Sequence, residues 1–337
     1  MVRSADALPD LALSRAVLNR SGIERRDGVL VERLLTDPAT RVLELRGDRA
    51  PVEPEVRPED HEEREEREEH GHLRLQLRAP MPEDSGRLVL FAGRDGEGTA
   101  YLGVALPVEG LDRAERGRGR LPDAEGWVTL RQAGAALGDR DAGLFTTVLS
   151  LANWHGTHTH CPRCGAPTAM AQGGWLRVCP ADHSEHYPRT DPAVIMAVVD
   201  EDERLLLGRG PQWPDNRFSV LAGFVEPGES LEAAVAREVE EEVGIDVTDV
   251  RYLGNQPWPF PSSVMIGFTA RALGTSIELD PHELSEARWV TRDGYRAALR
   301  TGAIHRPFGL SIAKRIIEHW LGQTIESVMA DSGPIPG

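Results

Sequence analysis

Three glutamates that lie close together in the sequence are the residues best suited to chemistry. Glu238, Glu241 and Glu242 follow Arg237 in the segment REVEEE, and at 100° per residue of a helix they fall within about one hundred degrees of arc. Like charges three or four residues apart cost a helix roughly 0.2–0.5 kcal/mol per pair. A hard divalent cation offsets this cost, because Mg²⁺ and Mn²⁺ prefer oxygen ligands and bridge carboxylates to phosphates. The spacing therefore indicates a cation site for phosphate chemistry, although three clustered glutamates alone are also typical of a solvated helix face.

The helix that carries these glutamates is delimited by its own sequence. Ser230 is a good N-cap residue, and Gly244 can adopt the left-handed conformation that ends a helix. Arg237 can pair with Glu229 and fix the preceding loop against the helix. An apolar stripe beside the acidic one can pack against a sheet, and it consists of Leu231, Val235, Val239 and Val243.

The three cysteines form a second group with ligand chemistry. Cys161 and Cys164 make a CxxC knuckle, and Cys179 follows at a distance typical of a zinc ribbon. A repeated knuckle would place the fourth ligand at Asp182, but imidazole suits zinc better than a lone carboxylate, so we expect His183 and one structural zinc ion. The alternative is that the cysteines are small buried residues without a metal.

A third motif combines prolines with aromatic rings. The segment NQPWPFPSS at residues 255–263 holds three prolines, which exclude a helix or a central strand. It predicts a stiff, extended platform whose rings can stack on a flat heterocycle such as nicotinamide or adenine. A rigid packing loop is the alternative.

Composition divides the chain into four regions. Residues 1–150 hold short apolar or alternating stretches between turn residues, which predicts a β-rich N-terminal domain. We expect its acidic insertion at 53–70 to be a solvated segment without function. Residues 151–190 hold the cysteines, residues 191–325 hold the glutamates and the proline-rich motif, and residues 326–337 are expected to form a flexible tail.

Charge and hydropathy exclude several classes of protein. The 337 residues carry a formal net charge of −16, which argues against non-specific nucleic-acid binding as the main activity. The longest purely apolar run, 193–199, is far too short to span a membrane, and the first residues do not form a secretory signal. Three cysteines do not form a complete disulfide framework, so we expect a cytoplasmic protein in a reducing environment.

The glutamate segment also resembles a known signature. Residues 223–245 fit Gx5Ex7REUxEExGU, where U is a bulky apolar residue, at every fixed position, which resembles the Nudix hydrolase superfamily. A zinc ribbon, this box and the proline-rich motif in that order resemble the NADH pyrophosphatase subfamily. The resemblance implies an α+β protein, with a Nudix α/β/α sandwich preceded by a zinc ribbon and the β-rich domain.

The resemblance also implies which residues act on metals. Glu238 and Glu242 would bind two or three catalytic Mg²⁺ or Mn²⁺ ions, with Glu241 as a third candidate. The backbone carbonyl of Ala222 and the later acid Glu283 would complete the metal site. The implied reaction is hydrolysis of the pyrophosphate bond of NADH or NAD⁺ to give NMNH or NMN and AMP.

Substrate contacts follow from the same resemblance. Tyr187 and Phe224 would sandwich the nicotinamide, and Ala313 would contact the substrate through its backbone. The remaining contacts belong to the proline-rich motif: Gln256, Pro257, Trp258, Pro259, Phe260, Pro261, Ser262 and Ser263. Asn255 in place of Ser, the missing fourth cysteine and Gly174 in place of a Glu found in some relatives are departures from the family pattern.

Other substrates and roles stay open at this point. NAD-capped RNA and ADP-ribose also present a pyrophosphate, and a nucleotide-sensing module without catalysis is a further alternative. Members of the subfamily often form homodimers, and the N-terminal domain is the expected interface. No membrane partner is expected.

Overall fold

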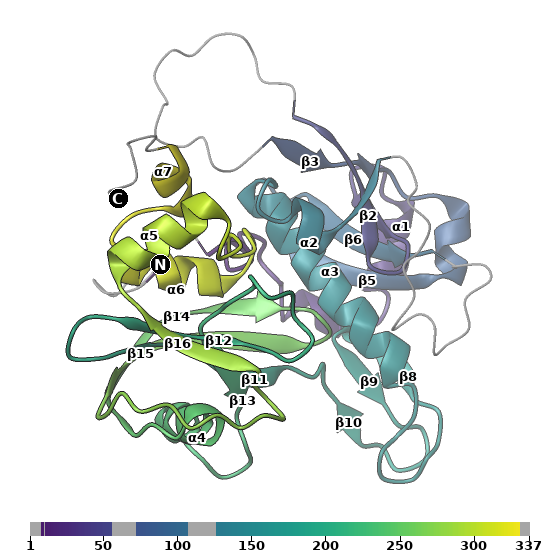
Figure 1. The fold of residues 1–337 in the computed structure, drawn as a ribbon. Helices are drawn as coiled ribbons and strands as arrows, with labels where there is room; N and C mark the ends of the chain where they lie inside the picture. Colours follow the sequence, from purple (N-terminus) through teal and green to yellow (C-terminus); the bar gives the residue numbers. More distant parts are fainter. Residues whose placement is uncertain (1–7, 10, 56–71, 107–125, 331–337) are drawn as a thin grey trace. The chain divides into compact units, whose positions relative to one another are not determined.

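The computed structural model describes residues 8, 9, 11–55, 72–106 and 126–330 (Figure 1). Contacts within the chain divide it into two compact units. The N-terminal unit comprises Ala12–Thr190 and Trp258–Ser262, and the C-terminal unit comprises Asp191–Pro257, the chain from Ser263 onward and the residues up to Leu11. The acidic insertion expected at 53–70 lies outside the described residues from residue 56 onward.

The N-terminal unit begins with two small sheets, which confirms the β-rich prediction. One sheet has the order β4-β1-β6-β5 and the other β3-β2-β7, and within the first sheet β1 and β6 run parallel. Their strands are β1 (Arg41–Leu45), β2 (Arg49–Pro54), β3 (Leu73–Leu75), β4 (Leu77–Arg78), β5 (Leu88–Arg94), β6 (Ala100–Ala105) and β7 (Trp127–Thr129). The helices of this unit are α1 (Leu30–Thr36), α2 (Leu130–Ala133) and α3 (Asp139–Thr157).

Helix α3 is the long element of the N-terminal unit. Its side chains from Ala142 to Leu149 are nearly all buried, and Val148 packs so closely on β6 that a Cβ at Gly103 would lie 2.3 Å from a Val148 methyl group. A domain boundary between residues 150 and 151, expected from composition, would cut this helix. The structure therefore contradicts a boundary there and keeps the cysteine region in the same unit.

The cysteine region adds a third small sheet of order β10-β9-β8. Its strands are β8 (Ala169–Ala171), β9 (Leu176–Val178) and β10 (Glu185–His186). All neighbours in this sheet are antiparallel. The loops that precede β8 and connect β9 to β10 carry the cysteines.

The C-terminal unit is built on a six-stranded sheet of order β14-β15-β11-β12-β16, with β13 paired to β11. The neighbours β11 and β15 are parallel, from Asp191 opposite Ser263 to Val199 opposite Arg271. The strands are β11 (Asp191–Val199), β12 (Leu205–Arg209), β13 (Leu221–Phe224), β14 (Val247–Trp258), β15 (Ser263–Ala272) and β16 (Glu286–Val290). The helices are α4 (Leu231–Val243), α5 (Arg292–Thr301), α6 (Ile312–Leu321) and α7 (Ile325–Ala330).

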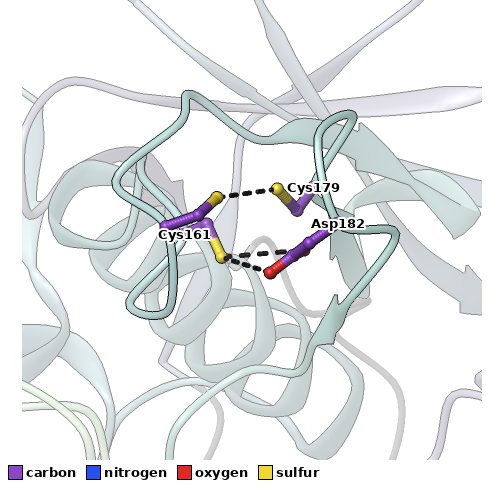
Figure 2. Close-up of side chains that lie close together, drawn as sticks. Cys161, Cys179 and Asp182 are labelled. Carbon is purple, nitrogen blue, oxygen red and sulfur yellow. Dashed lines mark hydrogen bonds between the residues drawn. The ribbon is translucent and has the colours of Figure 1, made fainter.

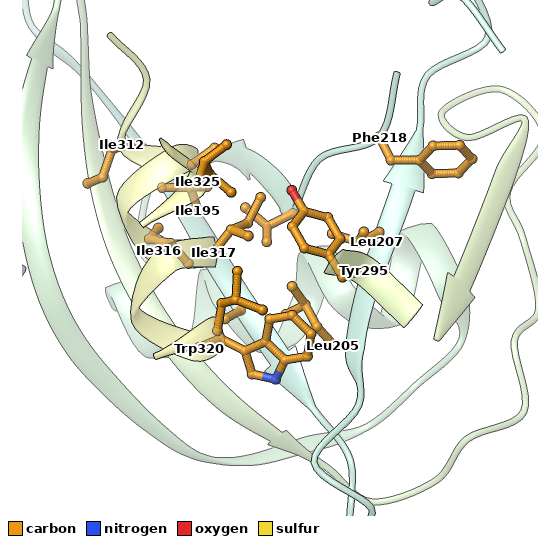
Figure 3. Close-up of a cluster of buried hydrophobic side chains, with 14 of the residues drawn as sticks. Ile195, Leu205, Leu207, Phe218, Tyr295, Ile312, Ile316, Ile317, Trp320 and Ile325 are labelled. Carbon is orange, nitrogen blue, oxygen red and sulfur yellow. The ribbon is translucent and has the colours of Figure 1, made fainter. Parts of the chain in front are cut away.

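Both faces of this sheet are covered by helices. Along β11, Val194, Met196 and Val198 belong to a core cluster with the apolar residues of α4. The alternate residues, including Ile195, belong to a second cluster with residues of α5, α6 and α7 (Figure 3). A strand buried on both faces explains why its sequence is a continuous apolar run. The expected α/β/α sandwich is thus confirmed.

The last helix corrects one expectation. Residues 326–330 belong to α7 instead of a flexible tail, and Val328 is fully buried in the core. The carboxylate of Glu318 accepts a hydrogen bond from the backbone N–H of Ile325 at 2.9 Å, and Lys314 pairs with Glu326 at 2.9 Å. These contacts fix α7 to α6, and residues 331–337 lie outside the described part of the chain.

Candidate active site and metal centres

Three carboxylates converge at α4 in the C-terminal unit. Glu238 and Glu242 lie one turn apart on α4, and Glu283 joins them from the turn that precedes β16. Ligand oxygens of the three residues all lie within 4.8 Å of one another. Glu238 and Glu242 are only 8% and 6% exposed, whereas Glu283 is exposed. The group is therefore closed on the helix side and accessible from the side of Glu283.

Local structure brings these residues together as the sequence indicates. The hydroxyl of Ser230 accepts a hydrogen bond from the N–H of Ala233 and caps α4, and Gly244 ends the helix with a φ of 67°. Beyond the helix, the N–H groups of Glu278 and Asp280 donate to the carbonyls of Val243 and Glu242. This pair of backbone hydrogen bonds holds the segment that leads to Glu283 against the end of α4.

Gly223 on β13 provides the space for the group. A Cβ built at this position would lie 1.8–2.0 Å from the carboxylate atoms of Glu238, a distance that no side chain can occupy. The glycine of the box therefore lets the Glu238 carboxylate lie directly on the strand. The neighbouring Ala222 lies on the same strand, opposite Ile195 of β11.

The electrostatics of the group fit a bound cation. Burial, followed by the charges of Glu238 and Glu283, raises the pKa of the Glu242 carboxyl to about 8. Burial also raises the pKa of Glu238, although Arg237 acts in the opposite direction. The Oε2 atom of Glu242 is buried without a hydrogen-bond partner. An orphaned buried oxygen beside two further carboxylates is costly, and a hard divalent cation would satisfy all three residues.

Glu241 has a different environment from its two neighbours. Its carboxylate is exposed and pairs with Arg237 at 2.8 Å, and it is not a member of the three-carboxylate group. Arg237 also pairs with Glu229 at 2.7 Å and donates to the carbonyl of Phe224 at 2.9 Å. The proposed third metal ligand is thus an ion-pair partner of Arg237, whereas the expected pairing of Arg237 with Glu229 is present.

The exposed aromatic residues lie in both units. Phe224, at the end of β13, is 61% exposed in the C-terminal unit, and Tyr187 is 63% exposed in the N-terminal unit. Their joint contact with one nicotinamide stays a prediction.

Two expected substrate contacts have partners inside the protein. The Gln256 side chain is 1% exposed, and its amide donates to the carbonyl of Leu310 at 2.9 Å. The backbone N–H of Ala313 donates to the hydroxyl of Ser311, the N-cap of α6, at 3.2 Å. The Gln256 side chain therefore supports the turn before α6, and the expected substrate contacts of Gln256 and Ala313 stay predictions.

The proline-rich motif is divided between the units. Gln256, Pro257 and Trp258 are the last three residues of the edge strand β14, and Ser263 begins β15. By contacts, Trp258–Ser262 belongs to the N-terminal unit. The rings of Trp258 and Phe260 meet edge to face with centroids 4.8 Å apart. We call the segment Trp258–Ser262 the aromatic array.

The cysteines form a second group of possible metal ligands in the N-terminal unit. Cys161, Cys164, Cys179 and Asp182 each offer a ligand atom within 4.8 Å of the others (Figure 2). The sulfur atoms of Cys164 and Cys179 are 3.4 Å apart, and the Cys161 sulfur lies 3.6 Å from an oxygen of Asp182. Four convergent donors of this chemistry fit a closed tetrahedral zinc site.

His183, the expected fourth ligand, is not part of this group; its role stays a prediction, and the geometry favours Asp182. Its φ is 57°, and its backbone N–H donates to the Cys179 carbonyl in the knuckle turn. The preceding residue Asp182 points its carboxylate at the sulfur atoms instead. The spacing of a repeated CxxC knuckle predicts a ligand at position 182. The expectation of His183 came from the preference of zinc for imidazole over a lone carboxylate.

Ser184 stabilises the aspartate in this position. Its hydroxyl and its backbone N–H both donate to Oδ1 of Asp182, at 2.6 and 3.0 Å. These two hydrogen bonds are the main reason that the pKa of Asp182 is lowered. Ser184 also makes the largest contribution to lowering the pKa of the Cys161 thiol to about 6, while burial raises the pKa of Cys179 to about 11.

Comparison with protein families agrees with this geometry. A model of the NUDIX domain matches residues 189–309, which contain the three-carboxylate group. The chain contains a Nudix domain. A model of the NADH pyrophosphatase zinc ribbon domain matches residues 157–187, which contain the cysteine group and precede the Nudix domain.

Two curated relatives match more than half of the chain. The chain is 47% identical over 204 residues to the "NAD-capped RNA hydrolase NudC" of Mycobacterium bovis, which covers 57% of this chain and 64% of the relative. It is 42% identical over 197 residues to the human "NAD-capped RNA hydrolase NUDT12", which covers 55% of this chain and 43% of that relative. The chain thus spans less than two thirds of the length of these relatives.

The crystal structure of a NUDIX hydrolase from Nitrosomonas europaea aligns with a TM-score of 0.39 and 23% identity, covering 49% of this chain and 94% of that chain. Among the described helices of the present protein, none combines the length and the apolar character needed to cross a membrane.

Proposed function

We propose that the protein hydrolyses the pyrophosphate bond of NADH or NAD⁺, giving NMNH or NMN and AMP. The observation that supports this most strongly is the group of Glu238, Glu242 and Glu283 beside Gly223, with one buried carboxylate oxygen that lacks a partner. Its residues are suited to holding Mg²⁺ or Mn²⁺, and the matched zinc ribbon belongs to the NADH pyrophosphatase type.

Each side chain has a defined part in this proposal. Glu238, Glu242 and Glu283 hold the cations, with the carbonyl of Ala222 as a further donor. Divalent cations at this position would neutralise the diphosphate and make a water molecule more nucleophilic. Arg237 positions the box by connecting α4 to Glu229 and to the Phe224 carbonyl, so that the Phe224 ring is available to the nicotinamide. Tyr187, the aromatic array and the backbone near Ala313 would supply the other substrate contacts.

NAD-capped RNA is the second candidate substrate. The relatives described above carry the name NAD-capped RNA hydrolase, and the reacting bond in such a substrate is the same pyrophosphate. ADP-ribose and other dinucleotides would present it as well. A sensing module without catalysis is less well supported, because Glu238, Glu242 and Glu283 all converge.

We propose that the ribbon binds one structural zinc ion through Cys161, Cys164, Cys179 and Asp182. A site with four protein ligands leaves no open position for a substrate. Free cysteines in this group fit a reducing cytoplasm. A homodimer is expected from the resemblance to the subfamily, and light scattering coupled to size-exclusion chromatography tests it.

Hydrolysis of a set of candidate substrates tests the proposed function. The purified protein is incubated with NADH, NAD⁺, ADP-ribose and an NAD-capped RNA in the presence of Mg²⁺ or Mn²⁺, and the products are identified by mass spectrometry. We expect a mononucleotide and AMP from NADH, or NMN and a 5′-monophosphate RNA from the capped RNA. Absence of hydrolysis with all four substrates would refute the proposal.

A further inference from the structure

We propose that the N-terminal unit positions the aromatic array for substrate binding, through Asn153 of α3 and Arg131 of α2. The inference rests on the proposed function, since it assigns these residues to the binding of the same dinucleotide. It gives the N-terminal unit a role that composition alone did not indicate.

Asn153 holds the backbone of the array at two points. Its side-chain nitrogen Nδ2 donates to the carbonyl of Pro259 at 3.1 Å and to the carbonyl of Pro261 at 3.0 Å. These two carbonyls flank Phe260. One amide group therefore fixes the backbone on both sides of the ring.

The composition of the array makes such an external donor necessary. Pro259 and Pro261 have no backbone N–H, so the segment cannot form a regular pattern of hydrogen bonds with a neighbouring strand. Within the segment, the N–H of Phe260 donates to the carbonyl of Trp258 at 2.7 Å. The carbonyls of Pro259 and Pro261 need donors from elsewhere, and Asn153 supplies both.

Arg131 acts on the rings of the array. Its guanidinium carbon lies 3.8 Å from the ring centroid of Phe260 and 5.0 Å from that of Trp258. Both distances are within the range of cation–π attraction. Helix α2 is itself fixed at its start, where Thr129 and Gln132 form a capping box. The guanidinium thus constrains the ring orientation from a fixed helix.

Neither residue belongs to the three-carboxylate group, so both are positioning residues. Releasing the array should weaken substrate binding because the free segment would have to be ordered when the dinucleotide binds. The chemical step should change much less, since the carboxylates remain in place. The expected signature is a rise in KM with little change in kcat.

The experiment compares Asn153→Ala, Asn153→Asp and Arg131→Gln with Ser150→Ala as the control. Ser150 lies one turn earlier on α3, and its hydroxyl donates within the helix to the carbonyl of Thr146. We expect about a tenfold higher KM for NADH in Asn153→Ala, from two lost hydrogen bonds, and kcat within about threefold of wild type. Asn153→Asp keeps the shape but turns a carboxylate toward two carbonyl oxygens, so it should be at least as damaging. A role in packing alone would leave Asn153→Asp similar to wild type.

Arg131→Gln keeps the test decisive if an Asn153 variant fails to fold. Arg131 is exposed, so this variant should unfold at the wild-type temperature, and we expect its KM to rise about threefold. Wild-type KM in Asn153→Ala and Arg131→Gln would overturn the inference while leaving the proposed function intact. If the wild-type protein hydrolyses no substrate, the proposed function fails, and binding of NADH to the same variants, followed by its fluorescence, decides the inference separately.

Discussion

The two groups of possible metal ligands in this protein are built in opposite ways. The carboxylates of Glu238 and Glu242 extend from a regular helix, are buried, and include an oxygen without a partner. The cysteine group lies on loops, and its aspartate receives two hydrogen bonds from Ser184. In the first group burial raises the pKa of Glu242, whereas in the second hydrogen bonds lower the pKa of Asp182.

The carboxylate group would need a cation to balance its buried charge. The ligands of the cysteine group are already held in place by hydrogen bonds. Burial raises the pKa of Glu238 and of Glu242, which lie beside a third carboxylate, and one side of the group is accessible through the exposed Glu283. An accessible cation site is suited to catalysis, and a site closed by four protein ligands is suited to stabilising a fold.

Replacing one oxygen of the Glu242 carboxylate should have the largest effect on catalysis by the three-carboxylate group. We expect Glu242→Gln to lower kcat for NADH hydrolysis by about 10³-fold, because a neutral amide cannot replace the charge of the carboxylate. KM should change less. Glu241→Gln is the matched control, since Glu241 pairs with Arg237 outside the group, and its loss should not exceed about tenfold. Equal losses in the two variants would show that Glu241 is also a metal ligand.

Adding one carbon atom at Gly223 should have the next largest effect. The Cβ of Gly223→Ala would overlap the carboxylate of Glu238, so that carboxylate must move away from the group. A displacement on this scale should cost about 10²-fold in kcat/KM. Gly274→Ala is the control, because a Cβ there meets nothing within 4 Å. Full activity of Gly223→Ala would mean that Glu238 can bind its cation from another position.

Substitution of Asp182, the possible fourth ligand of the cysteine group, should affect zinc content and stability instead of catalysis. We expect Asp182→Ala to lose zinc and to unfold at a lower temperature, by roughly 4–8 °C for a destabilisation of about 2 kcal/mol. Asp182→Cys should retain zinc at least as firmly as wild type, because it restores a four-thiolate site. Zinc content by mass spectrometry and thermal unfolding measure these effects. Loss of zinc from His183→Ala, with retention in Asp182→Ala, would restore the original ligand prediction.

The smallest expected effect is on the pH dependence of the free energy of unfolding, to which the buried Glu242 should contribute. Glu242 has a pKa of about 8 in the folded protein and an ordinary value of 4.5. Between these values the folded protein binds a proton that the unfolded chain has released, so stability falls as pH rises. After dialysis against EDTA, the free energy of unfolding should decrease by up to about 1.4 kcal/mol per pH unit in this window.

Two comparisons test the assignment of this slope. Mg²⁺ should reduce it by taking the place of the proton, and Glu242→Gln should remove the contribution of this residue. Glu240→Gln alters an exposed glutamate on the same helix and should leave the slope unchanged. An identical slope in Glu242→Gln and wild type would show that other residues cause it.

In the N-terminal unit, composition predicted the strands but neither the domain boundary nor the long-range contacts. Its strands were predictable from short alternating stretches such as 72–77, where Leu75 is buried between two exposed neighbours, because a half-buried strand has a period of two. The apolar residues of 141–154 have helical spacing across residue 150, so this helix was predictable too; the domain boundary placed there from the change in composition at the cysteines was not correct, because α3 packs against β6 as one element. The association of Asn153 with the array joins residues more than one hundred positions apart, and no local pattern contains such a contact.

The sequence by itself determined the box helix, its caps, two of the three convergent carboxylates and the three cysteines of the possible zinc site. These features follow from spacing within a few turns of chain, where helical periodicity and knuckle geometry restrict the arrangement. Only the tertiary structure decided that Glu283 lies within reach of Glu238 and Glu242, that Glu241 pairs with Arg237, and that the Asp182 carboxylate lies beside the cysteine sulfur atoms. These outcomes depend on which side chains burial and backbone hydrogen bonds leave without partners, and that is settled only when distant segments pack together.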